Sequence, residues 1–291
     1  MQNKVCVITG ATSGIGKATA LGLAKMGATV IITGRDQVEG EIVQREIKNK
    51  SGNSKVDLLL ADLSSQAEIH KLAQEIKVRY PRLHVLINNA GIAPVKRSVT
   101  VDGGERIFAV NYLAPFLLTH LLLDRLEAGE PARIINVAGD YHRKATIQFD
   151  DLMSEKEYNG IRANNQAKFA LIIFTYELAR RLDGTGVTSN CLHPGAAATD
   201  GPLKDPDLPA FSRLMYRMVR VFFASPEKGA ETSIYLATSP EVENVSGKYF
   251  IKKKPAASSP ESYDEGIAHR LWKVSEELTG LMKPEKEVSH A

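Results

Sequence analysis

The stretch KVCVITGATSGIG, residues 4–16, determines how this chain folds. Its first half is a short run of β-branched and apolar residues, which predicts a buried strand, and its second half places glycines where a helix would begin. Gly10 permits a tight turn, whereas Gly14 and Gly16 allow a bound group to approach the backbone closely. The free N–H groups at the start of the helix would then hold a pyrophosphate. The stretch therefore predicts a strand, a turn and a helix arranged around a dinucleotide.

Further apolar runs alternate with amphipathic stretches along the chain. The runs lie at 28–34, 56–63, 83–91, 132–139, 187–195 and 247–251, and the helical stretches lie at 14–26, 38–50, 65–80, 103–128, 160–182 and 226–238. This alternation favours βαβ units and a parallel sheet. We therefore predict an α/β fold, a single doubly wound Rossmann domain over residues 1–291 with a seven-stranded parallel sheet.

The C-terminal part, about 252–282, is predicted to form a loop and a last helix. Residues 252–266 are rich in proline, serine and charge, which indicates a loop. The helix that follows carries Leu271, Trp272 and Leu278, and we expect these three side chains to dock on the body of the domain.

The composition of the 291-residue chain is that of an ordinary soluble protein, with 43% hydrophobic and 24% charged residues. A net charge of +3 is too small to indicate a nucleic-acid partner. Cys6 and Cys191 lie in apolar runs and are predicted as buried thiols, which fits a reducing compartment. No signal peptide or membrane span precedes the first strand, so we expect a cytoplasmic protein. The histidines and carboxylates show no metal-ligand spacing, and no metal is predicted.

The residues after the second strand indicate which nicotinamide nucleotide is bound. A free ribose 2′-hydroxyl usually meets a carboxylate at this strand end, but here Gly34 occupies the place and Arg35 follows it. A guanidinium suits a 2′-phosphate. We predict NADP, in the reduced form NADPH, over NAD, although Asp36 leaves NAD open.

Four motifs resemble the short-chain dehydrogenase/reductase (SDR) family. They are TGATSGIG (9–16), NNAG (88–91), VNYLAPF (110–116) and HPGAAAT (193–199). LARRLDGTGVT (178–188) and RLWKVSEELTGL (270–281) are similar to the retinol-dehydrogenase-like subgroup. The likeness covers nearly the whole chain.

The resemblance implies a set of cofactor contacts at or beyond the carboxyl ends of the strands. Asp62 is implied at the adenine, Asn89 beside the adenosine ribose, Thr199 at the nicotinamide, and Lys168 on the nicotinamide ribose. The full set is Gly10, Thr12, Ser13, Gly14, Ile15, Gly16, Arg35, Asp62, Leu63, Asn89, Ala90, Gly91, Lys168, Pro194, Gly195 and Thr199.

The catalytic positions of the family are kept only in part. In the family, a tyrosine four residues before a lysine supplies a proton, a serine ends the fifth strand, and an asparagine lies on the preceding long helix. Asn111 and Lys168 match their positions here, whereas the tyrosine is replaced by Asn164 and the serine by Gly139. An amide cannot give up a proton at accessible pH. Losing a general acid costs about 10²–10⁴ in rate and losing an oxyanion donor about 10²–10³, so ordinary carbonyl reduction should be close to lost.

The segment after the fifth strand offers candidate substitutes for the missing acid. Tyr141 and His142 could reach the substrate from the opposite wall, or they could be surface-loop residues with no catalytic role. No spacing in the sequence decides between these interpretations.

Residues 200–225 stand where the family has a variable substrate lid. Arg213, Arg217 and Arg220 recur at helical spacing, with Leu214, Met215, Met218 and Phe222 on other faces. Methionine and phenylalanine suit an adaptable apolar wall, so we expect the substrate to be a small molecule with a bulky hydrophobic body. Attachment to a membrane surface through 211–223, simple packing and a dimer contact stay open. The resemblance also implies a homodimer or homotetramer formed through the helices at 103–128 and 160–182.

Three functions remain compatible with these residues. The first, which we favour, is an NADP-dependent oxidoreductase that works without the usual tyrosine and serine. The second is a non-redox enzyme, such as a cyclase or isomerase, built on the same scaffold. The third is a noncatalytic NADP-binding protein.

Overall fold

The computed structural model describes residues 1–195, 203, 205, 207–219 and 223–282. An eight-stranded sheet in the order β3-β2-β1-β4-β5-β6-β7-β8 forms the centre of the molecule. Its strands are β1 (Val5–Ile8), β2 (Thr29–Gly34), β3 (Val56–Leu60), β4 (Val85–Asn88), β5 (Ala132–Val137), β6 (Val187–His193), β7 (Tyr249–Ile251) and β8 (Lys254–Ala256). The first seven strands run parallel, which confirms the predicted doubly wound sheet.

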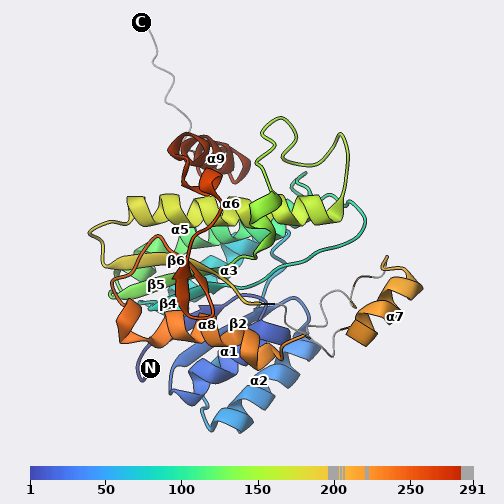
Figure 1. The fold of residues 1–291 in the computed structure, drawn as a ribbon. Helices are drawn as coiled ribbons and strands as arrows, with labels where there is room; N and C mark the ends of the chain where they lie inside the picture. The colour runs from blue at the N-terminus through green and yellow to red at the C-terminus, as the bar shows by residue number, and fades with distance from the viewer. Residues whose placement is uncertain (196–202, 204, 206, 220–222, 283–291) are drawn as a thin grey trace, which may run out of the picture.

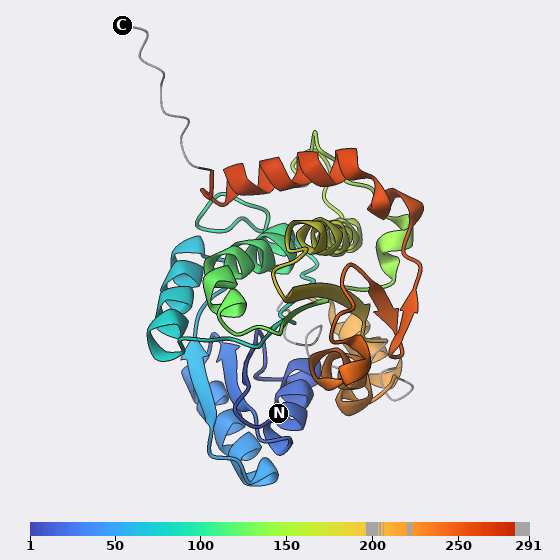
Figure 2. The same cartoon turned by 90° about the vertical axis from the view of Figure 1, so that its left-hand side faces the viewer.

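Helices cover both faces of the sheet (Figures 1 and 2). They are α1 (Gly14–Lys25), α2 (Gln37–Ser51), α3 (Gln66–Arg79), α4 (Arg106–Phe108), α5 (Ala114–Glu127), α6 (Gly160–Arg181), α7 (Ala210–Val219), α8 (Pro226–Thr238) and α9 (Glu265–Leu278). Helices α1, α2 and α8 pack on one face, and α3, α5 and α6 pack on the other. Most residues of the central strands are apolar because helices cover both faces of the sheet, whereas β6 also carries Thr188, Ser189 and Asn190 and the edge strand β8 is largely exposed.

The antiparallel strand β8 corrects the predicted loop at 252–266. It pairs with β7 through a two-residue turn in which Lys252 and Lys253 have φ values of 50° and 66°. Such turns usually carry asparagine or glycine, so two lysines give no hairpin signal. Pro255 lies in this edge strand, where a missing N–H is tolerated.

Helix α9 lies across α5 and α6, the helices through which an oligomer was expected (Figure 2). The ring of Trp272 is 5.2 Å from that of Phe116 and 5.8 Å from that of Phe174. Leu271 and Trp272 are buried as predicted. The prediction for Leu278 was wrong, because its side chain is 37% exposed; its carbonyl instead accepts a hydrogen bond from Gln66 Nε2.

The segment Arg106–Glu127 is long and apolar enough to cross a membrane by length and composition. Most of it is buried inside the fold, between the sheet and α9, so its apolar character serves the core. The expected helix at 103–128 is present from Arg106 to Glu127, but it is not α-helical throughout: α4 passes into a π-helical turn, Ala109–Leu113, before α5 begins. Both cysteines are buried free thiols, as predicted.

Candidate functional site

The glycine-rich turn after β1 is shaped by close packing against the end of β4. Gly10 has a φ of 62°, and a Cβ there would lie 2.9 Å from Ala90 Cα. A Cβ on Gly16 would lie 2.5 Å from the carbonyl oxygen of Gly10 and would also clash with the Asn89 amide. That amide donates to the carbonyls of Thr9 at 2.9 Å and of Gly10 at 3.2 Å. Asn89 and Ala90, after β4, therefore fix the conformation of this turn by packing and hydrogen bonds.

The start of α1 carries N–H groups that no side chain caps. Ser13 is the N-cap residue and its hydroxyl makes no capping bond, with Ile15 in the first turn behind it. By contrast, Asp36, Ser65 and Asn159 each accept hydrogen bonds from the first turns of α2, α3 and α6. Uncapped donors at a helix N-terminus form an anion site. This turn therefore fits the pyrophosphate of a dinucleotide.

The end of β2 has the features expected for a 2′-phosphate. A Cβ on Gly34 would clash with the methyl group of Thr12, so a side chain is excluded there. Arg35 is exposed at the same edge. Asp36 Oδ1 accepts a 2.7 Å hydrogen bond from the N–H of Glu39 as the cap of α2. The carboxylate that left NAD open is thus engaged by its own helix.

Asp62 and Leu63 follow β3 at the implied adenine position. Burial alone would raise the pKa of Asp62, but hydrogen bonds from Ser64 N at 2.9 Å and Ser64 Oγ at 2.8 Å outweigh it. The pKa of the carboxyl group is therefore lowered, and it is ionised at neutral pH. Leu63 is 9% exposed and packs into the core behind it.

Asn111 lies on the π-helical turn and is fixed by three hydrogen bonds. Its Oδ1 accepts from Ile92 N at 2.8 Å, and its Nδ2 donates to Ile92 O at 2.8 Å. The same Nδ2 donates to Asn164 Oδ1 at 2.9 Å. The Ile92 backbone sets the orientation of the first amide, which in turn sets that of the second. Asn164 Nδ2 is left as a hydrogen-bond donor at the tyrosine position.

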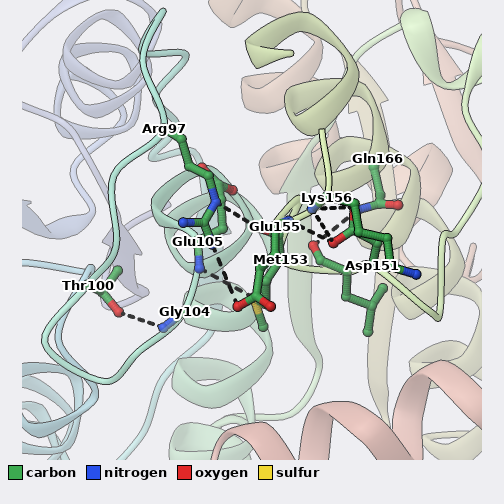
Figure 3. Close-up of polar contacts among 10 residues, drawn as sticks. Arg97, Thr100, Gly104, Glu105, Asp151, Met153, Glu155, Lys156 and Gln166 are labelled. Atoms are coloured by element: carbon green, nitrogen blue, oxygen red, sulfur yellow. Dashed lines mark hydrogen bonds and ion pairs between the residues drawn. The ribbon is translucent and has the colours of Figure 1, made fainter. Parts of the chain in front are cut away.

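A network around Met153 supports the segment that leads into this turn (Figure 3). Glu105 is 1% exposed, and its carboxylate accepts from the N–H groups of Ile107 and Phe108 at the start of α4. Arg97 Nε donates to Met153 O at 3.1 Å. Gln166 Nε2, on α6, donates to Leu152 O at 3.2 Å. Leu152 and Met153 are therefore bonded both to Arg97, in the segment that leads to Asn111, and to Gln166 on α6, the helix that carries Asn164.

Lys168 lies one turn beyond Asn164 on α6. Its Nζ donates to Val137 O, at the end of β5, at 2.7 Å. A Cβ on Gly91 would be 3.4 Å from this Nζ and 3.5 Å from Asn111 Oδ1, so Asn111, Lys168 and Gly91 converge. Burial lowers the pKa of Lys168 to about 8.

Gly139 occupies the serine position at the end of β5 and leaves open space. A Cβ there would meet nothing within 4 Å. Its carbonyl accepts hydrogen bonds from His142 Nδ1 at 2.9 Å and Tyr249 Oη at 3.2 Å. His142 is fully buried, so the surface-loop interpretation was wrong for this residue. The backbone of Tyr141 lies in a 3₁₀ turn, but its side chain falls outside the described structure.

The lid region is described in part. Pro194 and Gly195 follow β6, and Gly195 has a φ of 81°; Thr199, Arg220 and Phe222 lie outside the described residues. Figure 1 shows α7 at the side of the body. Val95 N donates to Asp205 Oδ2 at 2.9 Å and Lys96 pairs with Asp207 at 2.7 Å, which ties the segment before α7 to the loop after β4.

Helix α7 does not have the orientation of a closed lid, because its apolar side chains face outward and an arginine faces inward. Phe211 is 74% exposed, Leu214 56% and Met218 59%, with Met215 beside them. Arg213 is half-buried, and its guanidinium donates to Asp205 O at 2.9 Å, whereas Arg217 is exposed. The apolar side chains are therefore available to a ligand or a partner.

Two of the supports described above could not be read from residue types. Ile92 and Val137 act through backbone groups, which every residue carries. Only the place of Val137 at the end of β5, and of Ile92 in the loop after β4, would have signalled a role. The free N–H groups of α1 were predicted, but that the Ser13 hydroxyl leaves them uncapped was visible only in the structure.

The fold and the turn after β1 define a dinucleotide-binding α/β protein. Residues 4–204 match the short chain dehydrogenase family, and the chain belongs to this family of nicotinamide-dependent oxidoreductases. It is 43% identical to retinol dehydrogenase 14 of Homo sapiens, over 97% of this chain and 88% of the relative.

Solved structures agree with this assignment. An uncharacterised protein from Mycobacterium Paratuberculosis superposes with a TM-score of 0.77 and 30% identity, covering 96% of this chain and 94% of that one. A short chain dehydrogenase from Burkholderia cenocepacia in complex with NADP gives a TM-score of 0.67 and 25% identity, covering 86% of this chain and 96% of that one.

Proposed function

We propose that this protein is an NADP(H)-dependent oxidoreductase that acts on a bulky hydrophobic molecule and does not use a tyrosine–serine pair. The observation that carries the proposal is the amide pair: Asn111 and Asn164 are hydrogen-bonded at 2.9 Å where the family has a phenol one turn before the lysine. Within the described residues, the turn after β1 and the end of β2 keep the features that suit a dinucleotide. The site can thus bind and orient a nucleotide and a substrate, but position 164 has no group that can transfer a proton.

Several residues support NADP as the nucleotide. The uncapped turn at Ser13 suits the pyrophosphate, and Arg35 beside the bare Gly34 suits the 2′-phosphate. Lys168 would hold the nicotinamide ribose. A bound NADPH would supply a hydride. The structural relative that was solved with NADP is in accord with this choice.

The substrate must accept a hydride without needing a strong acid. An iminium carbon does so, because its reduction ends at a neutral amine. Asn164 Nδ2 can donate a hydrogen bond to a polar group of the substrate, but it cannot transfer a proton. The exposed apolar side chains Phe211, Leu214 and Met218 favour a bulky apolar body. The name of the retinol dehydrogenase relative refers to a molecule of that kind.

A binding titration and an oxidation assay test the proposal. We expect the fluorescence of NADPH to show tighter binding than that of NADH, and absorbance of the reduced nucleotide to fall faster with cyclic imines than with ketones of matched shape. The variant Asn164→Leu, which cannot pair with Asn111, should lose imine turnover. Binding without oxidation across aldehydes, ketones and imines would overturn the proposal in favour of a noncatalytic protein. Substrate conversion with no net redox change would favour a cyclase or isomerase.

The cytoplasmic location and the homo-oligomer stay predictions. Contact with a membrane surface through 211–223 is a weaker alternative, for which the exposed apolar side chains of α7 are the supporting observation. Fractionation of cells and light scattering of the purified protein would test them.

A further inference from the structure

The amine of Lys168 differs from the lysines that form ion pairs, because its only polar partner among the described residues is a buried backbone carbonyl. Lys17 and Lys50 pair with Glu46 at 2.6 and 2.8 Å, and Lys96 and Lys228 also contact carboxylates. Lys168 Nζ donates to the neutral carbonyl of Val137, and no carboxylate of the described residues lies within 4.0 Å of it. Among the residues that the structure describes, no anion therefore holds this amine in its protonated form.

The amine also lies beside an exposed glycine. Gly91 is exposed and has no side chain, and a Cβ there would stand only 3.4 Å from Lys168 Nζ. Gly139, beyond the end of β5, leaves a second gap in which a Cβ would meet nothing within 4 Å. Asn164 replaces a much larger phenol one turn earlier, and its oxygen is held by Asn111. No side chain of Gly91 therefore covers the amine on this side.

We propose that, in the protein without nucleotide, Lys168 condenses reversibly with the aldehyde group of an apolar molecule. The amine nitrogen attacks the carbonyl carbon to give a carbinolamine, which then loses water to give an imine. The two hydrogens of the neutral amine leave with the carbonyl oxygen, so no oxidant or reductant is needed. The apolar side chains of α7 are exposed, and the segment before this helix is bonded to the loop that follows Gly91.

The protonation of Lys168 supports this reactivity. With burial lowering its pKa to about 8, about half of the amine is neutral at pH 8, against well below 1% of an ordinary lysine. Burial is the sole cause of the shift, and no neighbouring charge among the described groups contributes to it. The neutral form is the nucleophile.

Nucleotide and aldehyde should exclude each other. The family resemblance implies that Lys168 holds the nicotinamide ribose, and an imine at the same nitrogen would occupy that place. Bound NADP⁺ should therefore protect Lys168. A ligand of the adenosine half alone, such as 2′-AMP, should leave it reactive.

The test traps the imine in the full-length protein. Cinnamaldehyde and sodium cyanoborohydride are added at pH 8, and the labelled lysines are identified by peptide mass spectrometry. We expect Lys168 to be labelled at least about tenfold more than any exposed lysine, because its neutral fraction is larger. An excess of NADP⁺ should suppress this label, and 2′-AMP should not.

Two variants complete the design. Lys168→Arg keeps the positive charge but cannot form an imine, and it should lose the dominant label; circular dichroism establishes that it folds. Lys25→Arg, at the exposed end of α1, should leave the label unchanged. Labelling of Lys168 no greater than that of Lys25, or an adduct that survives in Lys168→Arg, would overturn the proposal. Because the assay involves no hydride transfer from NADPH, its result is independent of the proposed oxidoreductase activity.

Discussion

The two ends of the cofactor cleft differ in how tightly their residues are packed. At the pyrophosphate end, an added methyl group on Gly16 would stand 2.5 Å from a backbone oxygen. At the catalytic end, a methyl group on Gly139 would meet nothing within 4 Å, and Asn164 depends on one hydrogen bond from Asn111. Binding residues are therefore constrained by the fold itself, whereas the acid positions can change without disturbing it.

The largest effect is expected from refilling the catalytic end. Asn164→Tyr with Gly139→Ser should raise carbonyl reductase activity by about 10²-fold or more, because it restores a general acid and a hydrogen-bond donor. The space beside Gly139 admits the serine. NADPH oxidation with a panel of ketones measures the gain. Asn164→Phe with Gly139→Ala adds similar bulk without hydroxyls, and an equal rise in this control would show that shape rather than acid chemistry was restored.

A pair of glycine substitutions compares the two ends directly. Gly16→Ala should weaken NADPH binding by about 100-fold, and it should lower the free energy of unfolding by about 1–3 kcal/mol, because the backbone around Gly10 must move. Gly139→Ala should change both quantities very little. Fluorescence titration and urea denaturation measure them. Normal binding by Gly16→Ala would mean that the turn is far less constrained than its packing indicates.

A smaller effect is expected at the 2′-phosphate. Arg35→Ser should weaken NADPH binding by about tenfold and leave NADH binding nearly unchanged, because one charge-assisted hydrogen bond is lost. Arg45→Ser, on the exposed face of α2, removes the same charge and should have little effect. If both nucleotides weaken equally in Arg35→Ser, the arginine does not read the 2′-position.

An effect of similar size concerns the stability of the nucleotide-free protein. The pKa of Lys168 is about 8 in the fold and near 10.5 in the unfolded chain. Between these values the unfolded chain binds more protons, so stability rises with pH in this window. Lys168→Met should therefore be about 1–2 kcal/mol more stable than the natural chain at pH 7, the loss of the bond to Val137 O offsetting part of the gain.

Urea denaturation from pH 7 to pH 10 measures that difference. It should shrink as the pH rises through the window, whereas Lys25→Met should show no such trend. A difference that stays constant with pH would mean that Lys168 is not buried as a charged group.

Local chemistry made most of the fold predictable. Burial of both faces made most of the parallel strands recognisable as largely apolar runs, and the turn at 9–16 marked the nucleotide end. The β7–β8 hairpin was not predictable, because Lys252 and Lys253 adopt left-handed conformations that lysine seldom signals. The short run of three residues in β8 is also below what periodicity can detect.

The sequence predicted which residues form the candidate site, but it did not predict the hydrogen bonds between them. The spacing to Lys168 exposed the replacement at Asn164, but nothing in the sequence indicated that Asn111 would reach across to it. The buried place of His142 was missed because polar residues after a strand usually face solvent. Its bond to the Gly139 carbonyl depends on a turn whose shape appears only in three dimensions.

The packing of α9 has a practical consequence for following this molecule in solution. Trp272 is the single tryptophan of the chain, and it is enclosed by phenylalanine rings with the Arg181 guanidinium 3.9 Å from its ring centroid. Intrinsic indole emission therefore monitors the detachment of the C-terminal helix and is blind to events around the glycine turn. A denaturation curve recorded by tryptophan fluorescence would report when helix α9 detaches from the domain. Energy transfer from Trp272 to bound NADPH would be required to observe the nucleotide-binding end.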